Sequence, residues 1–215
     1  MLSPLEARVL GVLIEKQHTV PDTYPLSLNA LVGGCNQKTA RSPVIEATDA
    51  EVQTALDGLK GLSLIFEGSS SRVVKFEHNA ARMLQVPSQA VALLAVLMLR
   101  GPQTAAELRL NCERLHRFAD ISSVEGFLDE LAAKPVPMVL KLPRAVGERE
   151  ARWAQLLCGE VSLPPGRVAA TDDDSAFNVG AGEIAALRAE QTRLAAEVTE
   201  LRALVQRMAT ELGIH

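Results

Sequence analysis

The chain has 215 residues, of which 47% are hydrophobic, 22% charged and only 3% aromatic. This balance is typical of a globular protein and excludes the disordered, collagen-like and disulfide-stapled classes. The formal net charge is −4, so the molecule as a whole does not attract polyanions. Any contact with nucleic acid therefore requires a local basic patch.

The cysteines and the apolar segments indicate the compartment. Cys35, Cys112 and Cys158 are far apart, show no CxxC spacing and are odd in number, so they cannot form a closed disulfide framework. The longest apolar run, 90–99, is about half of the roughly 20 residues that a bilayer span requires. We therefore expect a cytoplasmic protein with reduced thiols and no membrane partner.

Three helices and a hairpin are predicted in the first 78 residues. The first helix spans about the first 17 residues, with Ser3 as N-cap and Pro4 in the first turn. A short second helix begins near Ser27, and a third follows Thr48, where Glu51 completes a capping box. Two β-prone runs, at 62–66 and 72–76, then predict a hairpin with a flexible tip. This is the order of elements in a winged helix.

The same apolar pattern then recurs further along the chain. The matching segments are 9–14 with 93–98, 31–35 with 108–112, and 52–59 with 124–131. Their separation falls from 84 to 77 to 72 residues, because insertions and deletions collect in loops while packed faces keep their spacing. Segments 138–142 and 152–157 would be the second pair of wing strands. The prediction is a mainly α protein with small β-hairpins, of the α+β class, with tandem winged-helix domains at 1–78 and 86–158.

A linker and a long helix are predicted after the second domain. Residues 159–182 are rich in Pro, Gly and Asp, which is typical of a flexible linker. Residues 183–213 carry a heptad pattern that favours a parallel two-stranded coiled coil and hence a homodimer. The core positions of this pattern are Ile184, Leu187, Gln191, Leu194, Val198, Leu201, Val205 and Met208. The alternative is a helix that packs back on its own domains.

Several longer stretches resemble one known family. They include Leu26-Ser27-Leu28-Asn29-Ala30-Leu31 with Cys35-Asn36-Gln37-Lys38, Leu99-Arg100-Gly101-Pro102-Gln103-Thr104, and Arg114-Leu115-His116-Arg117-Phe118-Ala119-Asp120. On these stretches the chain is similar, over residues 2–158, to the YceH-like family of uncharacterised bacterial proteins. The resemblance implies a tandem winged-helix fold and no known activity, cofactor or functional residue.

The third helix of each repeat lacks the charges that a standard recognition helix needs. A helix in the major groove presents basic and amide side chains to phosphates and base edges. The expected outward positions are Ala50, Gln53, Thr54 and Asp57 in the first repeat, and Ser122, Glu125, Gly126 and Asp129 in the second. Neither face has Arg or Lys, and each has Asp at the same place.

Basic residues lie instead on the predicted loops and wings. They are Lys38, Arg41, Arg72, Lys75, Arg114, Arg117, Lys141, Arg144, Arg149 and Arg152. These side chains could bind the phosphates of duplex DNA. The alternative is that they are solvated charges on exposed hairpins. Likewise, the cluster Asn36-Gln37-Lys38 could contact a base or a partner, although a polar cluster that caps its own backbone is the simpler interpretation.

Enzymatic readings have little support in the sequence. Cys112 and His116 stand at i and i+4, a spacing that could make a thiolate–imidazole pair or two metal ligands. Cys112 aligns with Cys35, however, and the first repeat has Thr39 where His116 lies. Both cysteines are better explained as small buried residues in equivalent core sites. We expect no catalytic residue, metal or cofactor.

Two functions fit the sequence. The first is a non-enzymatic, DNA-associated transcriptional regulator that binds duplex DNA mainly through wings and loops. The second is an adaptor that binds other proteins through the acidic outward faces and the coiled coil. Fold analogy favours the first function, and the placement of charge favours the second.

Overall fold

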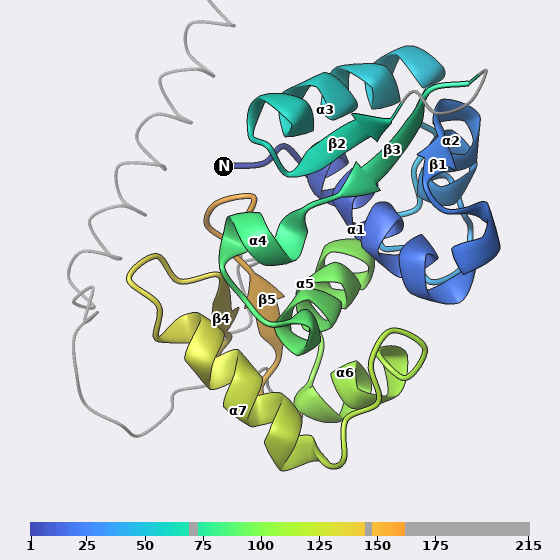
Figure 1. Cartoon of the computed structure of the whole chain (residues 1–215). Coiled ribbons are helices and arrows are strands. Elements are labelled where there is room, and N and C mark those ends of the chain that lie inside the picture. Colours follow the sequence, from blue (N-terminus) through green and yellow to red (C-terminus); the bar gives the residue numbers. More distant parts are fainter. Residues whose placement is uncertain (69–72, 145–147, 162–215) are drawn as a thin grey trace, which may run out of the picture. The chain divides into compact units, whose positions relative to one another are not determined.

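The first repeat contains three helices and a three-stranded antiparallel sheet. A computed structural model describes residues 1–68, 73–144 and 148–161 (Figure 1). Its first elements are α1 (Pro4–Thr19), a short 3-10 turn (Pro21–Thr23), β1 (Leu26–Ser27), α2 (Leu28–Cys35), α3 (Asp49–Gly61), β2 (Ile65–Gly68) and β3 (Lys75–His78). The strands lie in the order β1-β3-β2. The α+β class expected from the sequence is confirmed.

Local sequence signals fix the ends of these helices. The Ser3 hydroxyl accepts a hydrogen bond from the Glu6 amide, and the Glu6 carboxylate accepts one from the Ser3 amide. Thr48 and Glu51 form the same capping box at the start of α3, as predicted. The hairpin lies about three residues further along the chain than predicted, because a turn at 62–64 separates α3 from β2.

The second repeat has the same helix order and a smaller hairpin. It contains α5 (Ser88–Arg100), α6 (Ala105–Asn111), α7 (Ile121–Ala132), β4 (Val139–Lys141) and β5 (Trp153–Gln155), and the two strands pair antiparallel. A short helix that the sequence did not predict, α4 (Ala80–Leu84), lies between the repeats. The isolated bridge between Gln103 and Trp153 takes the place that β1 has in the first sheet.

The two repeats share one hydrophobic core, which is centred on their first helices. Figure 1 shows α5 beside α1, and the two helices are buried at 90–99 and 7–14, respectively. They approach closely at Gly11, where a Cβ atom would lie 3.0 Å from Leu99 Cγ. The Ser42 amide also donates to the Leu99 carbonyl across the boundary. The described residues therefore form one compact unit.

A second close approach lies within the first repeat. At Gly34 in α2 a Cβ atom would lie 2.6 Å from Val12 Cγ1 of α1, whereas at the adjacent Gly33 it would meet nothing within 4 Å. The absence of a side chain at Gly34 thus lets α2 pack against α1.

The structure does not describe residues 162–215. The predicted linker beyond residue 161 and the predicted coiled-coil helix 183–213 lie outside the described residues, together with all the predicted dimerisation residues.

Candidate nucleic-acid interface

The hairpin of the second repeat carries three exposed basic residues. Lys141 ends β4, and Arg144 and Arg149 lie in the connection to β5. The Lys141 ammonium lies 5.3 Å from the centre of the Trp153 ring, and Trp153 is itself buried in the core. This cation–π contact holds the base of the hairpin while its charge stays at the surface. The ordering role of Trp153 was not predicted from the sequence.

The hairpin lies beside the beginning of α7. Lys141 and Ile121, the first residue of α7, line the same groove, which has a volume of about 270 Å³. The acidic side chains of Glu125 and Glu150 line it as well. Lys141 therefore shares the groove with two acids, whereas Arg144 and Arg149 do not line it.

The loop between α6 and α7 adds Arg114 and Arg117, both exposed. Its conformation is fixed from within, because the buried Phe118 ring packs edge-on against His116, with ring centres 4.7 Å apart, and against Phe127. The Arg109 guanidinium donates to the Ala119 carbonyl on the same loop. These contacts present the two arginines on an ordered segment.

Two of the predicted phosphate-binding residues already pair with carboxylates of their own chain. Arg41 is buried, and its guanidinium donates to both carboxylate oxygens of Glu15, at 2.6 and 3.1 Å. Arg152 bonds to Glu107 and Glu148 at 2.8 and 3.3 Å. The prediction that these side chains face DNA is corrected, since each neutralises acidic groups of its own chain.

The remaining predicted bases belong to the first repeat. Lys38 is exposed, Lys75 is half-buried on β3, and Arg72 lies outside the described residues. The neighbouring Asn36 bonds through its amide to both backbone groups of Ala47, at 2.8 and 2.9 Å. Asn36 therefore braces the loop before α3 and does not use its side chain to cap its own helix.

The outward faces of α3 and α7 are acidic or neutral, as predicted. Asp57 is exposed and accepts a hydrogen bond from Gln53, and Glu125 and Asp129 are exposed on α7. No arginine or lysine offsets these carboxylates at the predicted outward positions. A phosphate backbone would meet repulsion on both faces.

The cysteines of the two repeats occupy equivalent core sites, which confirms the prediction. Cys35 and Cys112 are both fully buried. Burial raises the pKa of the Cys35 thiol to about 11 and that of the Cys112 thiol to about 12. Both thiols are therefore protonated at neutral pH and are poor nucleophiles.

Comparison with known proteins agrees with the expected family. The model of a family described as "Protein of unknown function, DUF480" matches residues 2–148. The chain belongs to the DUF480 family. UPF0502 proteins of Burkholderia multivorans, Burkholderia cenocepacia and Burkholderia lata are 69%, 68% and 67% identical to it over 213 residues. Each alignment covers 99% of this chain and 90% of the relative. The YceH-like resemblance is consistent with this DUF480 membership.

Among the described residues of this DUF480 chain, no helix combines the length and the apolar character that crossing a bilayer requires.

Proposed function

We propose that this protein is a non-enzymatic, DNA-associated transcriptional regulator whose second repeat contacts the duplex. The contacting groups are the bases of the β4–β5 hairpin and of the α6–α7 loop: Lys141, Arg144, Arg149, Arg114 and Arg117. One observation carries the proposal. All five side chains are exposed, and none of them forms an ion pair with a described residue.

The first repeat supports the assignment by contrast. Its Arg41 and Lys16 are paired with Glu15, and Lys60 at the end of α3 is paired with Glu67 on β2. A cation that already has a carboxylate partner gains little from a phosphate, because the existing pair must first be broken. Lys38 and Arg82 also lack an ion pair, but most of the exposed, unpaired cations among the described residues lie in the second repeat.

The charge pattern also indicates how the duplex would be bound. Carboxylates on the outward face of α7 oppose its insertion into a groove, whereas the hairpin and the loop can follow the backbone. Binding of this kind depends strongly on salt and selects weakly among sequences.

The proposal is tested by fluorescence anisotropy with a random-sequence duplex at low salt. The hairpin variant carries Lys141→Ala, Arg144→Ala and Arg149→Ala. The matched control carries Lys38→Ala, Lys75→Ala and Arg82→Ala, which removes the same charge elsewhere. If each lost base contacts one phosphate, the slope of log affinity against log salt becomes shallower by about 2.7 in the hairpin variant alone.

Two results would contradict the proposal. Equal weakening in both variants would show that only the net charge matters. Absence of binding by the intact protein at about 100 μM, the weak end of non-specific affinity, would exclude a duplex partner.

A specific observation favours the adaptor as a second candidate. The second repeat exposes large apolar side chains: Leu110 and Val136 are 68% and 76% exposed, and Ile121 begins α7, whose outward face is acidic. The variant Asp57→Asn with Asp129→Asn separates the two functions. It should strengthen binding to duplex DNA by removing repulsion, but it should weaken binding to a lysine-rich peptide.

A further inference from the structure

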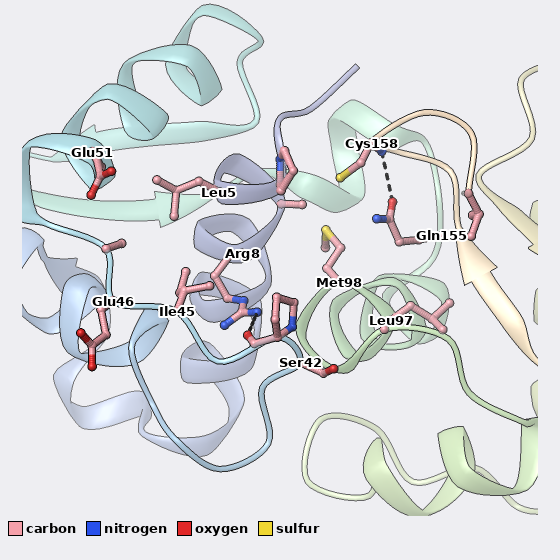
Figure 2. Close-up of a pocket in the computed structure, with 16 residues that line it drawn as sticks. Leu5, Arg8, Ser42, Ile45, Glu46, Glu51, Leu97, Met98, Gln155 and Cys158 are labelled. Carbon is pink, nitrogen blue, oxygen red and sulfur yellow. Dashed lines mark hydrogen bonds between the residues drawn. The ribbon is translucent and has the colours of Figure 1, made fainter. Parts of the chain in front are cut away.

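A large cavity lies where the two repeats meet, away from the basic hairpin. Its volume is about 750 Å³, and its walls come from α1, the loop between α2 and α3, the end of α5 and the segment after β5 (Figure 2). Leu5, Ile45, Leu97 and Met98 are the large apolar side chains of this wall. A cavity of this size and character is typical of sites for small molecules.

One buried cation lines this cavity. Arg8 of α1 is only 4% exposed, and its guanidinium donates to the backbone carbonyls of Cys35 and Pro43, at 3.1 and 2.6 Å. Its Nε atom is buried and has no hydrogen-bond partner among the described residues. No carboxylate of the described chain pairs with it. A buried charge with only neutral partners is costly and uncommon in folded proteins.

The neighbouring Arg41 shows what Arg8 lacks. Both arginines are buried in the first repeat, but Arg41 has a bidentate carboxylate partner in Glu15. Burial and repulsion from Arg41 lower the pKa of Arg8, as expected for a cation without a compensating anion. An anion from outside the chain would supply the missing charge.

Two carboxylates of the cavity lie apart from Arg8 and leave room for such an anion. Figure 2 shows Glu46 and Glu51 at one edge, with Arg8 between them and the side chains of Leu97 and Met98. Glu51 already accepts hydrogen bonds from the amide and hydroxyl of Thr48, at 2.8 and 2.7 Å. Leu97 and Met98 therefore form an apolar part of the wall across Arg8 from the acids.

We propose that this cavity binds a small-molecule monocarboxylate with an apolar body. Arg8 binds the carboxylate, and the apolar body lies against Leu97 and Met98. A neutral hydrocarbon would leave Arg8 without an anion, and a dicarboxylate would place its second charge against an apolar wall. The site is independent of the DNA surface proposed above.

Titration calorimetry on the full chain tests this assignment with decanoate as the probe and 1-decanol as its uncharged match. Arg8→Met keeps an apolar stem but removes the charge, and it should weaken decanoate binding at least tenfold. Arg100→Met removes the same charge from an exposed position at the end of α5 and should leave the affinity unchanged. Decanol should bind at least tenfold more weakly than decanoate.

A second variant keeps the test decisive if Arg8→Met perturbs folding. Ile45→Trp narrows the cavity at its half-buried wall and leaves Arg8 in place, so it should also weaken decanoate at least tenfold. The assignment is overturned if decanol binds as well as decanoate. It is also overturned if Ile45→Trp has no effect, or if the intact protein shows no binding at about 1 mM.

Discussion

The two repeats have side chains of different chemistry at equivalent buried positions. At the offset of 84 residues that relates α1 to α5, Glu15 of the first repeat corresponds to Leu99 of the second. Arg41 and Leu99 are buried, and the Glu15 side chain is only 16% exposed. A carboxylate that pairs with an arginine in one repeat thus occupies the position that an apolar side chain occupies in the other. Equivalence of position in this fold does not require equivalence of charge.

The difference matters because apolar contacts and ion pairs lose stability for different reasons when one member is replaced. An apolar pair that loses one member loses packing, whereas a buried ion pair that loses one member leaves an uncompensated charge. Attraction by Arg41 outweighs the burial that opposes ionisation of Glu15, so the pKa of Glu15 is lowered. The carboxylate is therefore charged at neutral pH and depends on its partner.

The largest expected effect is the loss of this pair. Glu15→Gln should lower the free energy of unfolding by about 3 kcal/mol, because Arg41 stays buried without a counter-charge. Glu107→Gln is the matched control in the second repeat, since Glu107 pairs with Arg152 at a part-exposed site and Gln preserves the helix cap. It should cost no more than about 1 kcal/mol. Urea denaturation measures both.

A double variant then replaces both members of the pair by apolar side chains. Glu15→Leu with Arg41→Phe removes both charges, and we expect less than half of the loss seen with Glu15→Gln, because no unpaired charge remains. A loss as large as that of the single variant would show that the rest of the Arg41 site matters more. Its bonds to the carbonyls of Gly34 and Ala40 would then be the main contribution.

The repeats also differ in whether the last residue of their last strand can titrate. β3 ends at His78, whereas β5 ends at Gln155, which does not titrate. Burial, with a smaller contribution from His18, lowers the pKa of His78 from 6.5 to about 4. Between these values the unfolded chain binds a proton that the folded chain does not, so stability falls as the pH is lowered from about 6.5 to about 4.

Replacement of this histidine should flatten that dependence. Comparing pH 7 with pH 4, wild type should lose about 2 kcal/mol more of its unfolding free energy than His78→Gln, after allowance for the partial exposure of the ring. Carboxylates titrate in the same range in both proteins, so the difference between them isolates His78. Parallel pH profiles would contradict the assignment.

The smallest expected effects are those of alanine substitutions at two adjacent glycines in α2, Gly33 and Gly34. Gly34→Ala should cost about 1–2 kcal/mol, because its Cβ atom would lie 2.6 Å from Val12 Cγ1 and the helices must separate. Gly33→Ala, with open space around it, should stabilise the protein by about 0.5 kcal/mol through helix propensity. Thermal unfolding of the two variants measures whether each one is destabilised or stabilised. The second repeat has Leu110 and Asn111 at these positions, so its α6 does not depend on such a contact.

The sequence predicted the helices and the apolar core better than the buried polar contacts. The periodic apolar residues, the N-cap Ser3, the capping box at Thr48 and the repeated cysteines all act locally or recur, so they could be recognised along the chain. Arg41 was predicted to face DNA because a basic residue in a loop is usually exposed. Its partner Glu15 is 26 residues away, and only the packing of α1 against the 36–47 loop brings the two together.

The same limit applies to the candidate sites. Arg114, Arg117, Lys141, Arg144 and Arg149 were placed correctly at the surface, because loops and hairpins expose long charged side chains. The cavity around Arg8 could not be predicted, since α5 and the segment after β5 complete its walls from the second repeat. Nothing in the local pattern around Arg8 indicates such distant neighbours.

The contact between α1 and α5 joins two equivalent helices, each the first of its repeat. A lone repeat would have to cover that apolar helix with a copy of itself, so the chain has the organisation of a homodimer whose subunits have been fused. Two identical subunits must carry identical residues, whereas fused ones are free to diverge. In the fused chain the first repeat can bury arginines such as Arg8 and Arg41, while the second repeat exposes arginines such as Arg144 and Arg149. Two identical subunits could not differ in this way.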